Sequence, residues 1–539
     1  MLSRTIHVLT ILTIVATALS FAPRALAGSS AVPAACANRV NNTHAKLLEC
    51  VTLEGVREHQ AAFQAIADAN GGTRAAGTPG YDASVDYVVE RLTAAGYNVT
   101  LDEFPFLFFA PAVLQQLTPV NVAHATGVFT ASGVGDVTAN VIPVDINLAP
   151  PRANTSGCDG AYTEAAVGAA IVADPAGPDD FAGFPAGAIA LIQRGGCSFA
   201  LKAYNAQAAG ASAMIMFNQG NDPTREGLIV GTLVVAAGTP GPVTIPVVGA
   251  SFASGVSLAQ PGSTAHVVVL APQTVTQVNV LAESQGGDPN NVVMAGAHLD
   301  SVQAGPGIND NGSGSAALIE VAEQMAKVNP RNKLRFAWWG AEESGLIGST
   351  QYVAGLSQAE RDQIALYLNF DMVGSPNYVF FIYDGDNSDG VGFPAGPGGS
   401  AEIEKTFERY FNSIEIAFKG TDFTGRSDYG PFIAVGIPAG GLFTGAEGVK
   451  TAAEAAEPDW GGIAGAQYDP CYHIACDTFA GTGSGAGSTP PGRGLIALDV
   501  NSDAIAYAVL QYAMNTSDVN GERGKGNFRL PPAEEEPAQ

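Results

Sequence analysis

The sequence has few basic residues for its length. Lys and Arg together number 25 against 51 Asp and Glu, so the formal net charge of the 539-residue chain is −26 at pH 7. A field of this sign repels the phosphates of nucleic acids and the headgroups of anionic lipids. We therefore expect neither a nucleic acid nor a membrane among the partners of the chain.

Two short sequence signatures of hydrolases are also absent. The chain contains no Gly-x-Ser-x-Gly, which carries the nucleophile of serine hydrolases, and no His-Glu-x-x-His, which carries the zinc ligands of thermolysin-like enzymes. These absences argue against both classes.

Long apolar runs are missing after the first residues. Near the start, Arg4 precedes the apolar run at 8–16, and Ala25-Leu26-Ala27 stands before Gly28. This pattern predicts a secretory signal peptide over residues 1–27. The alternative is an uncleaved anchor, but a membrane span needs about 20 apolar residues, and this run is shorter. We therefore expect a secreted, extracellular protein.

Cysteine is scarce, and all six cysteines lie after the signal. They form three couples that are close in sequence: Cys36 with Cys50, Cys158 with Cys197, and Cys471 with Cys476. Six cysteines allow fifteen connectivities, among which the sequence alone does not decide. Pairing within the couples is the expectation that we favour. Thiolate metal ligands at Cys471 and Cys476 are the alternative, but an exported chain favours a disulfide.

Glycosylation is a further expectation for an exported chain. Five Asn-x-Ser/Thr sequons would accept a glycan in a host that glycosylates: Asn41, Asn98, Asn154, Asn311 and Asn515.

Hydrophobic patterning divides the chain into segments. These are the signal peptide at 1–27, the N-terminal part of an α/β domain at 28–124, a β-rich insert at 125–272, the main α/β domain at 273–520 and an acidic, Pro-rich tail at 521–539. The main domain alternates buried strands with helices, which predicts a mostly parallel central sheet flanked by helices.

Candidate functional residues follow the ends of three predicted strands, at 292–295, 334–339 and 364–370. In open α/β sheets, sites lie beyond the carboxyl ends of the strands. The residues that follow these ends, together with a histidine in a loop between two cysteines, are His298, Asp300, Asp310, Glu342, Glu343, Asp371 and His473.

So many acids in one cleft cannot all stay ionised without a cation. Nitrogen and oxygen ligands with an open position suit catalytic Zn²⁺. A carboxylate that bridges two zinc ions roughly 3.5–4 Å apart is typical of the co-catalytic sites of aminopeptidases. Any one of these residues alone has an ordinary structural explanation, and the prediction depends on the whole set.

Two resemblances to known families arise from these segments. The predicted strand, helix and strand from Ala188 to Asn218 resemble the protease-associated domain. The main domain resembles the secreted two-zinc aminopeptidases of the aminopeptidase S and aminopeptidase Y type. The matching motifs are Ala297-His298-Leu299-Asp300-Ser301, Asn309-Asp310-Asn311-Gly312-Ser313-Gly314, Gly340-Ala341-Glu342-Glu343-Ser344-Gly345-Leu346, Asn369-Phe370-Asp371-Met372 and Cys471-Tyr472-His473.

The resemblance implies a role for each candidate. His298, Asp310 and Asp371 would bind one zinc ion, and Asp310, Glu343 and His473 would bind the other. Glu342 would be the general base, Asp300 would orient His298, and Tyr472 would polarise the scissile carbonyl. Arg426 would lie near the amino end of the substrate.

The resemblance also implies a substrate class: peptides with a free N-terminus and an apolar, leucine-like first residue. A zinc carboxypeptidase and a glutaminyl cyclase on the same scaffold are the alternatives among enzymes. The alternative from another class is a non-catalytic, receptor-like protein. Such a protein would be expected to lack ligands or the base, and here all are present.

Overall fold

The structure is a computed structural model, which describes residues 35–36, 38–153, 156–164, 169–234, 241–391, 395–484 and 492–520. The expected signal peptide, the tail at 521–539 and the sequon at Asn154 lie outside these residues. The chain forms two compact units. Unit 1 combines the residues up to Asp102 with those from Asn279 onward, and unit 2 comprises Glu103–Val278.

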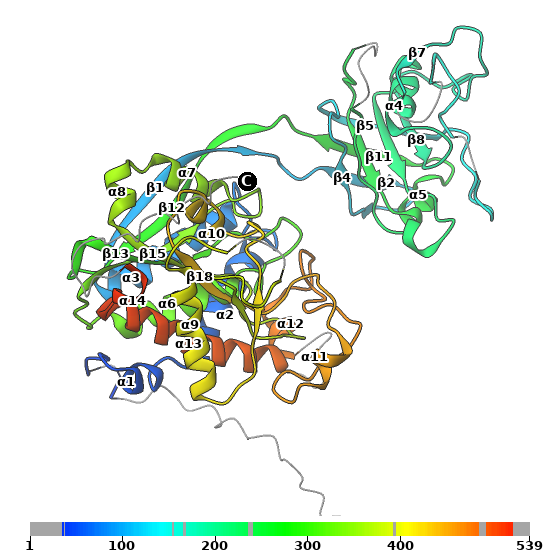
Figure 1. The fold of residues 1–539 in the computed structure, drawn as a ribbon. Helices are drawn as coiled ribbons and strands as arrows, with labels where there is room; N and C mark the ends of the chain where they lie inside the picture. The colour runs from blue at the N-terminus through cyan, green and yellow to red at the C-terminus, as the bar shows by residue number, and fades with distance from the viewer. Residues whose placement is uncertain are drawn as a thin grey trace, which may run out of the picture. The chain divides into compact units, whose positions relative to one another are not determined.

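Unit 1 is built on a mixed, mostly parallel sheet of eight strands (Figure 1). Strand β13 pairs in parallel with β14 and β15, and β15 pairs in parallel with β18. The strands, in their order across the sheet, are β1 (Asn98–Phe108), β12 (Gln273–Glu283), β14 (Asn332–Trp339), β13 (Asp288–His298), β15 (Ile364–Phe370), β18 (Ala439–Phe443), β16 (Phe381–Tyr383) and β17 (Lys419–Thr421). The predicted α/β class is confirmed.

Helices cover both faces of this sheet, as two adjacent tryptophans of β14 show. The indole of Trp338 donates to the carbonyl of Ser315 in helix α6, whereas the ring of Trp339 packs against Tyr352 of α7 and Phe432 of α10. Both tryptophans are fully buried, so they pack the sheet against helices. The helices of unit 1 are α1 (His44–Leu48), α2 (Leu53–Ala69), α3 (Pro79–Ala95), α6 (Gly312–Met325), α7 (Ile347–Gly355), α8 (Gln358–Gln363), α9 (Ser400–Ser413), α10 (Tyr429–Ala434), α11 (Ala452–Ala456), α12 (Phe479–Ser484), α13 (Arg493–Met514) and α14 (Ser517–Asn520).

Unit 2 contains its own sheet of eight strands. Its centre is parallel, because β8 pairs with β5 and β9, and β9 with β10, in the same direction. In order, the strands are β3 (Val122–Ala123), β2 (Val113–Thr118), β11 (Thr264–Val269), β5 (Gly135–Pro143), β8 (Ile189–Gln193), β9 (Ala213–Phe217), β10 (Val247–Ala250) and β4 (Gly127–Val128). The remaining elements are β6 (Tyr162–Glu164), β7 (Ile171–Ala173), α4 (Phe199–Ala208), α5 (Phe252–Leu258) and a 3₁₀ helix at Pro223–Arg225.

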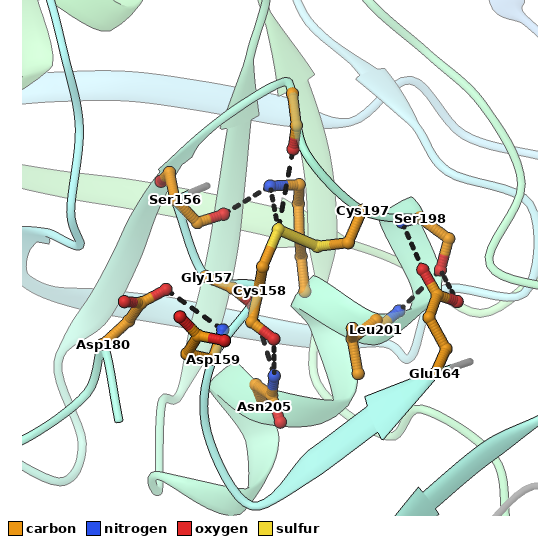
Figure 2. The surroundings of a disulfide bond; sticks show 12 residues. Ser156, Gly157, Cys158, Asp159, Glu164, Asp180, Cys197, Ser198, Leu201 and Asn205 are labelled. Atoms are coloured by element: carbon orange, nitrogen blue, oxygen red, sulfur yellow. Dashed lines mark hydrogen bonds between the residues drawn. A yellow bond between two sulfur atoms is a disulfide. The ribbon is translucent and has the colours of Figure 1, made fainter. Parts of the chain in front are cut away.

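A disulfide fixes the start of α4 in unit 2 (Figure 2). Next to Cys197, Ser198 caps the helix by accepting from the backbone N–H of Leu201, and its own hydroxyl donates to Glu164. The side chain of Asn205 donates to the carbonyl of Cys158. The predicted strand, helix and strand of this segment are β8, α4 and β9.

All three disulfides join the cysteines that lie nearest in sequence: Cys36–Cys50, Cys158–Cys197 and Cys471–Cys476. The favoured pairing is confirmed, and it rules out thiolate metal ligands at the third pair.

Two of the expected glycosylation sites are corrected by burial. The side chain of Asn311 is fully buried and accepts from Gly314 N as the N-cap of α6, and Asn41 is 2% exposed and donates to the carbonyl of Gln324. A glycan would have no room at either side chain in the folded chain.

No helix within the described part of the chain is both long enough and apolar enough to cross a membrane.

Candidate metal centre

The carboxyl ends of three adjacent strands bring the candidate residues together. In the sheet, β13 lies between β14 and β15, and the three run in the same direction. His298 is the last residue of β13, Glu342 and Glu343 follow β14, and Asp371 follows β15. These side chains therefore emerge at one edge, as the sequence predicts.

Asp310 stands between two histidines. Its Oδ1 lies 3.3 Å from His298 Nε2, which is also 3.3 Å from Asp371 Oδ1. Its Oδ2 lies 3.2 Å from His473 Nε2, which is 2.9 Å from Glu343 Oε2. The ligand atoms thus form two groups of three, and each group uses a different oxygen of Asp310.

Three carboxylate oxygens of these groups are buried and make no hydrogen bond, although two of them face a histidine nitrogen: Asp310 Oδ2, Glu343 Oε1 and Asp371 Oδ1. Leaving such atoms unpaired costs free energy, and a cation removes that cost. Burial raises the pKa of Glu343, and the charge of Asp310 raises it further. Nitrogen and oxygen donors in this arrangement fit a pair of zinc ions.

Two other groups of possible ligand atoms occur among the described residues, and neither fits a metal as well. In the group of His59, Glu320 and Glu323, Arg91 donates to both oxygens of Glu323. In the group of Asp384, Asp386 and Glu404, backbone N–H groups donate to both oxygens of Asp384.

Glu342 lies beside the two groups without belonging to either. Its Oε2 is 4.0 Å from His298 Nε2, and its side chain lines the cavity described below. Burial raises the pKa of Glu342 well above its ordinary value, and the charge of Asp371 adds to the rise. The position is suited to a group that exchanges a proton.

Asp300 contacts both the histidine and the glutamates. His298 Nδ1 lies 3.0 Å from the backbone carbonyl of Asp300 and 3.7 Å from its carboxylate. The carboxylate itself accepts from the backbone N–H groups of Glu342, at 3.1 Å, and Glu343, at 3.3 Å. It therefore ties the turn after β14 to the end of β13.

Tyr472 and Arg426 lie at the rim. The ring of Tyr472 stacks on His473 with 3.8 Å between centroids, and its hydroxyl accepts from Arg426 Nη2 at 3.3 Å. Arg426 also forms an ion pair with Glu447 at 2.8 Å.

A cavity of about 720 Å³ opens onto the two groups. Its lining includes Asp310, Glu342, Glu343, Asp371, His473, Tyr472 and Arg426. The lining also includes apolar and aromatic side chains, which are Leu346, Met372, Phe381, Tyr383, Tyr429, Phe443 and Tyr468.

The sequence analysis does not assign a role to two further residues near the site. Ser427 donates to Asp371 Oδ2 at 2.6 Å and accepts from Asn369 at 2.9 Å. Asp477 accepts from the backbone of Asp310. Ser427 directly follows Arg426, and Asp477 directly follows Cys476 of the loop that carries His473. This nearness to predicted site residues marks both as candidates, although it does not show which atoms they contact.

The fold and the site together define a metal-dependent hydrolase with an α/β sheet. The sequence pattern of peptidase family M28 matches residues 279–486, and that of the PA domain matches residues 137–258. An aminopeptidase of Pseudomonas aeruginosa is 46% identical over 485 residues, which cover 88% of this chain and 84% of that protein. Leucine aminopeptidase 2 of Trichophyton equinum is 39% identical over 476 residues, which cover 86% of this chain and 83% of that protein.

The solved structure of a zinc aminopeptidase from Bacillus subtilis has the same fold. The superposition covers 85% of this chain and 94% of the Bacillus subtilis chain, with a TM-score of 0.54 and 23% sequence identity. The chain belongs to peptidase family M28, and it is an aminopeptidase of that family with a PA domain.

Proposed function

We propose that this protein is a secreted aminopeptidase that uses two zinc ions to release apolar N-terminal residues from peptides. The observation that carries the proposal is the placement of Asp310, whose two oxygens face two different histidines. Together with Asp310, His298 and Asp371 would hold one ion, and Glu343 and His473 the other.

When bound, the zinc ions would supply Lewis acidity toward the peptide carbonyl and lower the pKa of water. Glu342 would take the proton of the attacking water and pass it to the leaving amine. The carboxylate is free for this task because neither group of ligand atoms uses it.

Other side chains would position the substrate. The Tyr472 hydroxyl would donate to the scissile carbonyl, and Asp300 would hold His298 and the two glutamates in place through the contacts described above. Arg426, held by Glu447, would lie near the amino end of the substrate.

The lining of the cavity supports the substrate class. A free α-ammonium is attracted by the acids of the lining, and an apolar side chain can be buried among Met372, Phe381 and Phe443. The relatives named leucine aminopeptidase 2 support the same preference.

Export is supported by the sequence of residues 1–27 and by three disulfides. A relative from Mycobacterium tuberculosis, 41% identical, is named a probable lipoprotein aminopeptidase.

Hydrolysis of leucine p-nitroanilide, compared with its N-acetylated form, tests the proposed activity. We expect cleavage of the free amine alone, loss of activity after chelation and recovery with zinc. Equal cleavage of both substrates would contradict an aminopeptidase, and fewer than one zinc ion per carefully prepared chain would favour a non-catalytic protein.

A further inference from the structure

The loop that carries His473 is held at both ends by buried carboxylates. Asp469 precedes the disulfide-closed segment Cys471–Cys476, and Asp477 follows it. These aspartates are only 1% and 4% exposed. Both contact a loop that is distant in sequence, the one that carries Asp310.

Asp477 makes the closer connection to this loop. Its Oδ1 accepts from the backbone N–H of Asn309 at 2.7 Å, and its Oδ2 accepts from the backbone N–H of Asp310 at 2.9 Å. Both oxygens are therefore used by consecutive N–H groups. Asp469 adds a contact, because its Oδ2 accepts from the side chain of Asn309 at 2.6 Å.

The distance between these two loops determines whether Asp310 can contribute one oxygen to each of the two groups of ligand atoms. Asp310 Oδ2 has to reach His473 while Oδ1 reaches His298. The backbone of His473 is left-handed, with φ 59°, a conformation that a residue with a side chain keeps only when its surroundings enforce it. The disulfide Cys471–Cys476 and the flanking aspartates, which bond to the Asp310 loop, enclose this residue in the sequence.

We propose that Asp477 is a positioning residue of the metal centre. It fixes the backbone of Asp310 against the His473 loop, so that one carboxylate contributes to both groups of ligands. The inference rests on the proposed zinc pair. Partners of metal ligands typically change metal affinity or activity by about 10–100-fold when they are replaced.

The competing explanation is that Asp477 only stabilises the fold. Asp384, in the loop after β16, provides a matched control. It is 3% exposed, and its two oxygens accept from the backbone N–H groups of Ser388, at 2.9 Å, and Asp389, at 3.0 Å. Asp384→Asn disturbs the same kind of contact in a loop that carries none of the proposed ligands.

The experiment measures zinc affinity of the full chain by competition with a chelator, for wild type, Asp477→Asn and Asp384→Asn. The two N–H groups bond to different oxygens of Asp477, and an amide has a single oxygen. In the same orientation, Asp477→Asn therefore places its NH2 group against one of the two N–H groups. We expect this variant to bind zinc at least about 10-fold more weakly, and Asp384→Asn to bind as wild type does. Thermal unfolding of the zinc-free proteins reports stability separately.

Wild-type zinc affinity in folded Asp477→Asn, or an equal loss in Asp384→Asn, would overturn the inference while leaving the proposed function intact. If Asp477→Asn does not fold, Asp477→Glu takes its place. The longer side chain shifts the Asp310 loop, so unchanged zinc affinity would again overturn the inference. Absence of zinc from the wild-type protein would overturn the proposed function itself, and this inference with it.

Discussion

Replacing Glu342 by Gln separates proton transfer from metal binding. The two side chains have nearly the same size, and the backbone N–H of residue 342 keeps its bond to Asp300. Neither group of ligand atoms contains Glu342, so no proposed ligand is lost. Only the proposed proton acceptor disappears. General base catalysis contributes about 10²–10⁴-fold, which corresponds to a rise of about 3–5 kcal/mol in the activation barrier.

The assay compares kcat on leucine p-nitroanilide with the zinc content of the same preparation. We expect Glu342→Gln to retain the zinc content of the wild type and to lose most of its turnover. Glu343→Gln is the matched control, because Glu343 Oε2 lies 2.9 Å from His473 Nε2 and the change should weaken zinc binding. Loss of zinc from Glu342→Gln would reassign Glu342 as a ligand, and full turnover would exclude it as the base.

Three further predictions follow from the structure. Chelation should lower the melting temperature as well as the activity, because a ligand at 1,000 times its Kd stabilises the folded state by about 4 kcal/mol; an unchanged melting temperature would contradict a metal held by the native fold. Burial lowers the pKa of Lys202 from 10.5 to about 7. Between about pH 7 and pH 10.5 the amine is therefore protonated in the unfolded state and neutral in the folded state, so the stability of unit 2 should rise with pH over this range. Hydrogen exchange in β8 and β9, corrected for intrinsic rates, should show this rise, and Lys202→Met should reduce it. Peptide mapping of protein from a glycosylating host should find no glycan on Asn41 or Asn311, and occupancy of Asn311 in folded, active protein would contradict its burial as the N-cap of α6.

The sequence predicted the central sheet because each parallel strand is a short buried run followed by polar residues. The runs before His298, Glu342 and Asp371 correspond to β13, β14 and β15. Their carboxyl ends meet because parallel neighbours in a sheet share a direction, so the convergence of these residues follows from the order of elements.

Contacts between distant loops could not be predicted in the same way. Nothing in the local pattern around Asp477 shows that its carboxylate accepts from the backbone of Asp310, because that contact depends on how two loops approach each other. The limits of unit 2 are a similar case. The division between the two units falls inside strands β1 and β12, at a point where neither strand ends, and a reading of element boundaries does not locate it.

The turn after β14 explains how two adjacent glutamates can take different positions. Ala341 has a left-handed backbone, with φ 56°, and the Asp300 carboxylate accepts from the N–H groups of both glutamates. Their backbone is thereby fixed, and the side chains diverge, with Glu343 reaching His473 and Glu342 facing His298. Asp300 thus contacts the site in two ways, through its backbone carbonyl to His298 and through its carboxylate to this turn. Asp300→Asn should therefore disturb the glutamates more than the histidine. The backbone carbonyl of residue 300 still faces His298, whereas the side chain loses one of the two oxygens that accept from the turn.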